Sequence, residues 1–206
     1  MGAAPAASTP VSEARPPEFL DALRALRDAL EALGVPWMII GGVAVIAHGV
    51  PRYTADVDAT VSAPDAPLER IFDVFARLRV VPRIDGALAF ARERQIVLLR
   101  HEPSGVDLDV SLAWLPFELE AIRRSETRDY AGVIIRIPRP DDLVIYKLVA
   151  ARPRDLEDVE RLLLLHGPSL DLQHIIATVR QFADALEDTG RIDALERLLK
   201  KTGLRR

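Results

Sequence analysis

The spacing of apolar residues predicts a helix near the start of the chain. Five leucines recur at intervals of three and four with charged residues between them, at positions 20, 23, 26, 30 and 33. This spacing places them on one face of a helix. Gly34 follows directly, and a glycine commonly ends a helix. We therefore expect an amphipathic helix that stops at Gly34.

The next segments alternate between strand and helix patterns. The apolar run at 36–40 predicts a short buried strand, which leads into Gly41 and Gly42. Residues 43–49 predict a compact helix, and residues 55–61 alternate as a strand does. The order is strand, glycine turn, helix and strand.

The middle of the chain predicts a sheet with flanking helices. Residues 64–79 begin with helix-start residues and continue with a helical apolar pattern. Residues 87–93, 95–101 and 106–114 predict three strands. A further helix is predicted at 116–125.

The last third of the chain is predicted to be helical. Residues 131–139 predict a final strand, and helical patterns fill the chain from Pro140 onward. Turn-forming residues interrupt them at positions 153, 167 and 190. The expected fold class is α+β, a mixed β-sheet flanked by helices with a helical C-terminal region.

Composition supports a globular chain with an N-terminal tail. The 206 residues are 49% hydrophobic and 28% charged, which suits a soluble protein with a packed core. Residues 1–17 are rich in Ala, Pro and Ser and have no export signal, so they predict a disordered tail. The core is expected at 18–138 and the helical region at 139–206. With no membrane-spanning pattern, the expected location is the cytoplasm.

Charge and cysteine content restrict the chemistry. The chain has no cysteine, so disulfides and thiolate metal sites are excluded, and a metal must bind oxygen or histidine. The net charge of −4 argues against general coating of nucleic acid. Lysine occurs only at positions 147, 200 and 201, so a lysine in mid-chain is unusual here.

Two predicted strands each carry a pair of aspartates on one face. Alternate side chains of a strand share a face, so Asp56 lies beside Asp58, and Asp107 beside Asp109. An acidic strand face is often merely solvated. If the strands are neighbours, however, the carboxylates raise one another's pKa, and a divalent cation relieves the repulsion. Mg²⁺ or Mn²⁺ suits such an all-oxygen ligand set.

These features together resemble a known superfamily. An apolar strand, Gly41 and Gly42, an Asp-x-Asp pair and a later acidic strand resemble the nucleotidyltransferases that include DNA polymerase beta. Three segments, "HGVPRYTADVD", "GVDLDVSLAWLPFE" and "PDDLVIYKLVAARPRDLEDVERLL", look like the AbiEii-type nucleotidyltransferases, many of which are toxins. The resemblance covers residues 35–165, most of the chain.

The resemblance implies catalytic, metal-binding aspartates. Asp56 and Asp58 match the metal-binding pair, and the third carboxylate lies on the following acidic strand. The distance to "LPFE" favours Asp109, with Asp107 as the rival. Two Mg²⁺ ions are implied, with a nucleoside triphosphate held over Gly41 and Gly42.

The resemblance also implies nucleotide-binding residues elsewhere. Lys147 lies on an apolar helix face, where a lysine often only covers the core with its stem. It matches a lysine of the family's nucleotide site. Asp155 and Asp158 match acidic positions after it, and one of them is expected to position Lys147 or the substrate. Arg52 and Thr54 precede the aspartate pair and are assigned to phosphate or metal-bound water, although a loop arginine is often only solvated.

The expected function is Mg²⁺-dependent transfer of a nucleoside monophosphate to an acceptor hydroxyl. The resemblance implies RNA, especially a tRNA 3′ end, or a protein as acceptor, in a toxin with a cognate antitoxin. An antibiotic nucleotidyltransferase and a non-catalytic nucleotide-binding or partner-binding protein are the alternatives. An RNA-facing patch or a solvated surface accounts equally for the arginines at 92, 94, 100, 136 and 139 and the C-terminal "KKTGLRR".

Overall fold

The first helix forms as its leucine pattern predicts. The computed structural model describes residues 16–205, so the predicted tail at 1–17 lies outside the described residues except for its last two. Helix α1 (Pro17–Leu33) buries Leu23, Leu26 and Leu30 completely. Burial of each such side chain contributes about 1.5–3 kcal/mol. Gly34 ends the helix in the left-handed conformation, with a φ of 69°.

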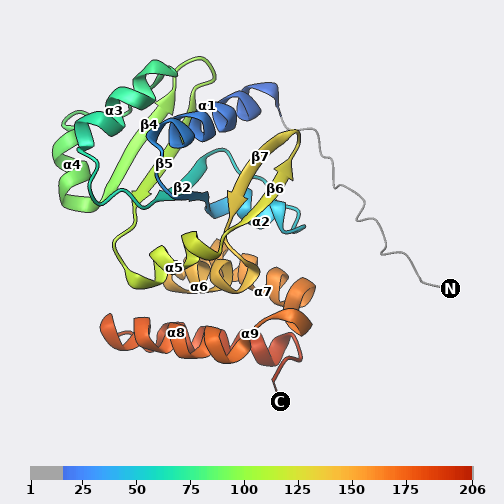
Figure 1. Cartoon of the computed structure of the whole chain (residues 1–206). Coiled ribbons are helices and arrows are strands. Elements are labelled where there is room, and N and C mark those ends of the chain that lie inside the picture. The colour runs from blue at the N-terminus through green and yellow to red at the C-terminus, as the bar shows by residue number, and fades with distance from the viewer. Residues whose placement is uncertain (1–15, 206) are drawn as a thin grey trace.

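A five-stranded mixed sheet forms the centre of the protein (Figure 1). Its strands, in spatial order, are β1 (Trp37–Ile39), β2 (Val57–Val61), β5 (Val106–Leu112), β4 (Ile96–His101) and β3 (Val80–Pro82). Strands β2 and β5 are parallel, and the other neighbours are antiparallel. The predicted mixed sheet is therefore confirmed.

Helices cover the sheet from more than one side. Helix α1 packs against β2, β5 and α3 (Leu68–Arg77), while α2 (Gly41–Ala47) follows β1 and contacts β2. Figure 1 shows α1 passing across the strands, with α3 and α4 (Ala87–Arg94) at one end. The sheet is thus fixed between the N-terminal helices and the helical part described next.

The strand prediction at 87–93 is wrong, because these residues form α4. Small and large residues alternate there and imitate a strand, yet Ala, Leu, Arg and Glu are strong helix formers. Only Ala87 and Ala91 are buried, one helical turn apart. Gly86 and Gln95 bound the helix in left-handed conformations.

Two short strands were not predicted. Strand β3 lies at the sheet edge, and β6 (Glu126–Tyr130) pairs with β7 (Val133–Ile137) in a separate two-stranded sheet beside β1. Among the five residues of β6 only Tyr130 is buried. Such a polar strand has little alternation from which to predict it.

The C-terminal part is helical, as predicted. It consists of α6 (Pro140–Ala150), α7 (Pro153–His166), a 3₁₀ turn (Gly167–Ser169), α8 (Leu172–Ala185) and α9 (Gly190–Lys201). Helix α6 contacts α2, α7, α8 and α9, and α5 (Pro116–Arg124) contacts β2. Figure 1 shows these helices on the side of the sheet away from α1. None of the described helices has the length and apolarity to span a bilayer.

Candidate active site

The two predicted acidic strands are neighbours, and their carboxylates come together. In the parallel pair β2 and β5, Asp58 lies directly opposite Asp109. Asp56 immediately precedes β2, where the buried Thr54 hydroxyl donates to its Oδ1 at 2.8 Å. Asp56, Asp58 and Asp109 all line one cavity. The structure therefore brings the three predicted aspartates to a common place.

Burial and mutual repulsion disfavour ionisation at this acidic cluster. Burial, followed by the charges of Asp56 and Asp109, raises the pKa of Asp58 from 3.8 to about 6. Burial also raises the pKa of Asp109, although the Arg83 guanidinium opposes this effect. Such a cluster has an excess of negative charge that a bound cation would offset.

The two glycines provide space directly beside this acidic cluster. Gly41 has a φ of +62°, and a Cβ built on it would lie 1.9 Å from Asp58 Oδ2. A Cβ on Gly42 would lie 2.5 Å from Thr54 Oγ1. Any side chain at either position would displace a predicted site residue.

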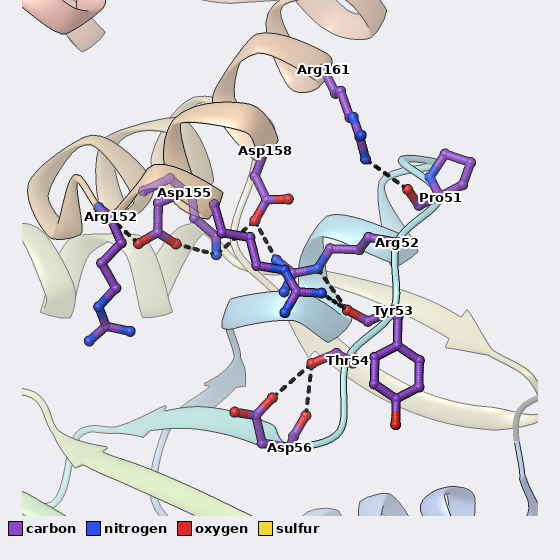
Figure 2. A network of polar contacts seen from close by, with 11 residues as sticks. Pro51, Arg52, Tyr53, Thr54, Asp56, Arg152, Asp155, Asp158 and Arg161 are labelled. Carbon is purple, nitrogen blue, oxygen red and sulfur yellow. Dashed lines mark hydrogen bonds and ion pairs between the residues drawn. The ribbon is translucent and has the colours of Figure 1, made fainter.

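Lysine 147 belongs to a buried network of charges. Its Nζ donates to Asp155 Oδ1 at 2.8 Å and lies 3.0 Å from Asp158 Oδ2. Arg52 Nη1 also donates to Asp158, and the side chains of all four residues are at least 89% buried. Figure 2 shows Asp158 pointing from α7 toward the loop that carries Arg52. Asp158 therefore joins Lys147 to Arg52.

Helix α7 also holds the backbone of the loop before β2. Arg154 Nη2 donates to the carbonyl of Tyr53, and Arg161 Nη1 donates to that of Pro51 at 3.2 Å. Dashed lines in Figure 2 mark the second contact. The helical C-terminal part thus fixes the loop that supplies Arg52 and Thr54.

A cavity of about 530 Å³ separates the acidic strands from the α6–α7 region. Small-molecule sites typically have volumes of this order. Of the nine predicted site residues, all but Thr54 line it, and Thr54 lies behind Asp56. A polar cavity with carboxylates on one wall and cations on another suits a charged ligand that carries a bound metal.

The chain matches a family model over residues 18–196, and the family is described as nucleotidyltransferase of unknown function (DUF6036). The chain belongs to this family. It is thus a nucleotidyltransferase, a transferase of nucleotidyl groups, as expected. The finer resemblance to AbiEii-type members stays a prediction. No curated protein matches the sequence.

Solved structures show the same fold. The crystal structure of ANT(2″)-Ia in complex with adenylyl-2″-tobramycin is 16% identical, with a TM-score of 0.55, over 82% of this chain and 99% of that chain. A solution structure of the antibiotic-resistance factor ANT(2″)-Ia is 17% identical, with a TM-score of 0.55, over 87% and 95% of the two chains. At these identities the likeness establishes the nucleotidyltransferase fold.

Within this nucleotidyltransferase, the two rival aspartates of β5 differ in their surroundings. Asp107 accepts a hydrogen bond from Arg100 Nε at 2.7 Å, which lowers its pKa, and it does not line the cavity. Asp109 lines the cavity and accepts from Arg83 Nη2 at 2.7 Å. Of these two aspartates, Asp109 is the one that the structure places at the cavity, and its role as the third carboxylate stays a prediction. Sequence reasoning missed Arg83, which follows the unpredicted strand β3.

An aromatic wall of the cavity was also missed. Phe117 of α5 lies 5.0 Å from Tyr146 of α6 and 5.6 Å from Phe182 of α8, measured between ring centres. All three line the cavity. Phe117 stands in the quoted "LPFE" segment, but nothing in the sequence shows that α8 reaches it.

The arginines of the possible RNA-facing patch do not share one element. They lie on α4, β4 and β7 and in the short segment between β7 and α6. Most form ion pairs, such as Arg92 with Glu69 and Arg139 with Glu126. Lys201 pairs with Glu160, and Arg206 of the C-terminal segment lies outside the described residues. Most of these arginines are therefore paired with acidic side chains within the described part of the chain.

Proposed function

We propose that the protein transfers a nucleoside monophosphate from a nucleoside triphosphate to an acceptor hydroxyl. The observation that carries the proposal is the pairing of Asp58 with Asp109 across parallel strands, beside Asp56 and at the wall of a cavity. In this reaction the acceptor oxygen forms a bond to the α-phosphorus, the bond to the β-phosphate oxygen breaks, and pyrophosphate leaves.

The donor set fits a hard divalent cation. Asp56, Asp58 and Asp109 offer only oxygen, and their mutual repulsion favours a bound cation. Among residues 16–205 no three acidic or histidine side chains are close enough to hold an ion by themselves. We therefore propose that the substrate's phosphate oxygens complete the site, as is usual for Mg²⁺. Mg²⁺ or Mn²⁺, as one or two ions, would polarise the α-phosphate and lower the pKa of the acceptor hydroxyl.

The chain's own residues bind and orient the substrates in this proposal. Gly41 and Gly42 leave room for the triphosphate beside Asp58. The Arg52 guanidinium lies next to Gly42, and Lys147 lines the same cavity. Thr54 orients Asp56, and Asp155 orients Lys147. Asp109, whose pKa is raised by burial, receives the acceptor proton.

For the acceptor we propose an RNA 3′ hydroxyl or a protein hydroxyl, in a toxin that a cognate antitoxin restrains. The support is the resemblance of the three quoted segments to AbiEii-type nucleotidyltransferases. The antitoxin would be a separate protein that restores growth when it is co-expressed.

A small hydroxyl-bearing molecule is the second candidate acceptor. Arg92, Arg100 and Arg139 are paired with carboxylates in the described residues, and this pairing leaves less positive charge for RNA and favours a small acceptor. The fold neighbour ANT(2″)-Ia, solved with adenylyl-2″-tobramycin, supports the same candidate.

A labelling experiment tests both proposals. The purified protein is incubated with Mg²⁺ and each α-³²P-labelled nucleoside triphosphate, together with total RNA, a protein extract or a panel of aminoglycosides. Label on RNA or protein supports the first acceptor class, and label on an aminoglycoside supports the second. Saturable nucleotide binding without transfer to any acceptor, in Mg²⁺ or Mn²⁺, would instead support a non-catalytic binding protein.

A further inference from the structure

Four cationic side chains line the cavity, and three of them are already engaged. Lys147 and Arg52 bind the aspartates of α7, and Arg154 binds the Tyr53 carbonyl. Across residues 16–205, Arg152 is different, because no hydrogen bond or ion pair involves its guanidinium. In Figure 2 its side chain extends away from the network.

The backbone on both sides of Arg152 is fixed. Ala151 ends α6 in the left-handed conformation, with a φ of 51°, and its N–H donates to the Lys147 carbonyl at 2.9 Å. The Arg152 N–H donates to Asp155 Oδ2 at 3.3 Å, and Pro153 begins α7. A left-handed conformation costs a non-glycine residue about 1 kcal/mol or more. This strained two-residue turn places Arg152 at the cavity wall.

Arg152 is exposed at the cavity wall, and no carboxylate among residues 16–205 forms an ion pair with it. In the network beside it, the two cations Lys147 and Arg52 balance the two aspartates of α7, so the formal sum is zero. Arg152 is near enough to the acidic cluster to oppose the rise in the pKa of Asp58, yet it forms no ion pair there. A planar guanidinium suits two phosphate oxygens at once.

We propose that Arg152 binds the β- and γ-phosphates of the nucleoside triphosphate, the part that leaves as pyrophosphate. This inference rests on the proposed function and deepens it. Reaction at the α-phosphorus takes place beside Asp58, and the cationic wall across the cavity receives the remaining phosphates. Two carboxylates already balance the charge of Lys147, which holds α6 to α7. Arg152 supplies the positive charge that is free to bind the phosphates.

Binding measurements without an acceptor test this assignment. Calorimetric titration compares a nucleoside triphosphate analogue with a non-cleavable α,β-methylene bond and the matching monophosphate, both with Mg²⁺. For Arg152→Gln we expect triphosphate affinity to fall about 10- to 100-fold, the effect of losing a charge-assisted hydrogen-bond pair. Monophosphate affinity should not change, and Arg152→Lys should recover part of the loss.

Arg180→Gln is the matched control, because Arg180 is an exposed arginine of α8 outside the cavity lining. It removes the same charge and should bind both nucleotides as the wild type does. Unchanged triphosphate affinity in Arg152→Gln would overturn the inference, as would an equal loss of affinity for both nucleotides. A wild-type protein that binds no nucleotide would overturn the proposed function, and the inference with it.

Discussion

The two polar walls of the cavity differ in how their charges are balanced. On the strand side, Asp56 and Asp58 have no ion-paired cation among the described residues, and the pKa of Asp58 is raised. On the helix side, Lys147 is held between the two aspartates of α7. Unpaired buried charges destabilise the free protein and favour binding of a ligand of opposite charge. Paired charges instead hold the helices and loops that carry them together. The predictions below test this difference.

The largest expected effect is on the rate of transfer by Asp58→Asn. The substitution keeps the shape of the side chain and removes a proposed metal ligand, so we expect kcat to fall by about 10³-fold or more. Single-turnover transfer of a labelled monophosphate measures the effect. Asp107→Asn is the control, because Asp107 lies on the same strand outside the cavity lining. Equal rates in the two variants would contradict the acidic wall as the reaction site.

Asp158→Ala should have the largest effect on stability. Removal of this carboxylate leaves Arg52 and Lys147 buried with Asp155 as the remaining acid of the network. Breaking a buried ion pair in this way costs about 3–5 kcal/mol in the free energy of unfolding. Urea denaturation measures the loss. Glu157→Ala, at the exposed neighbouring position, should change stability by no more than about 0.5 kcal/mol.

Gly41→Ala should affect both stability and transfer through the acidic wall, because the added Cβ would overlap the Asp58 carboxylate. We expect a cost of about 2–4 kcal/mol from overpacking and the positive φ, together with loss of transfer. Gly105→Ala is the matched control, with a φ of +70° and no atom within 4 Å of the new Cβ. It should cost only about 1 kcal/mol. A similar cost in both variants would show that the contact with Asp58 is unimportant.

The acidic wall should also make stability depend on pH. The pKa of Asp58 is about 6 in the folded protein, above the ordinary value of 3.8, so folding favours the protonated form. Its contribution is greatest below pH 3.8 and is lost as the pH rises through 6, by about 3 kcal/mol in the absence of divalent cations. Urea denaturation from pH 4 to 7 should show this decrease in the wild type. The decrease should disappear in Asp58→Asn and shrink when Mg²⁺ is added.

The smallest expected effect is at the exposed ion pair of Arg92 with Glu69. Both side chains are more than half exposed, so solvent screens the pair. We expect Arg92→Gln to change stability by at most about 0.5 kcal/mol and to leave transfer unchanged. Loss of transfer to RNA alone in this variant would instead restore Arg92 as part of an RNA-binding surface.

The strands of the sheet could be predicted where alternation is strong. The pattern at 106–114 gave β5, and the pattern at 55–61 gave β2, because one face of each strand is buried. The pattern at 87–93 failed because alanine, which alternated there with larger residues, fits a helix equally well. Strand β6 was not predicted, because its solvent-facing residues are all polar or charged.

The acidic wall was easier to predict than the helical wall. Asp56 and Asp58 share a face through a spacing of two, and only the pairing of β2 with β5 had to be assumed. The partners of Lys147 lie on another helix, and their positions depend on the left-handed turn at Ala151. No periodicity in a single sequence reveals such a turn. The sequence alone therefore gave no reason to assign a role to Arg152.

The burial of Arg52 has a consequence for synthesis of the protein on the ribosome. Its counter-ion Asp158 comes 106 residues later, so the loop before β2 emerges long before the residue that neutralises it. A nascent chain that ends near residue 138 would hold an arginine that has to stay hydrated, and its loop would stay open. We expect the predicted core at 18–138 and the predicted helical region at 139–206 to unfold in a single transition, since neither part contains both members of the pair.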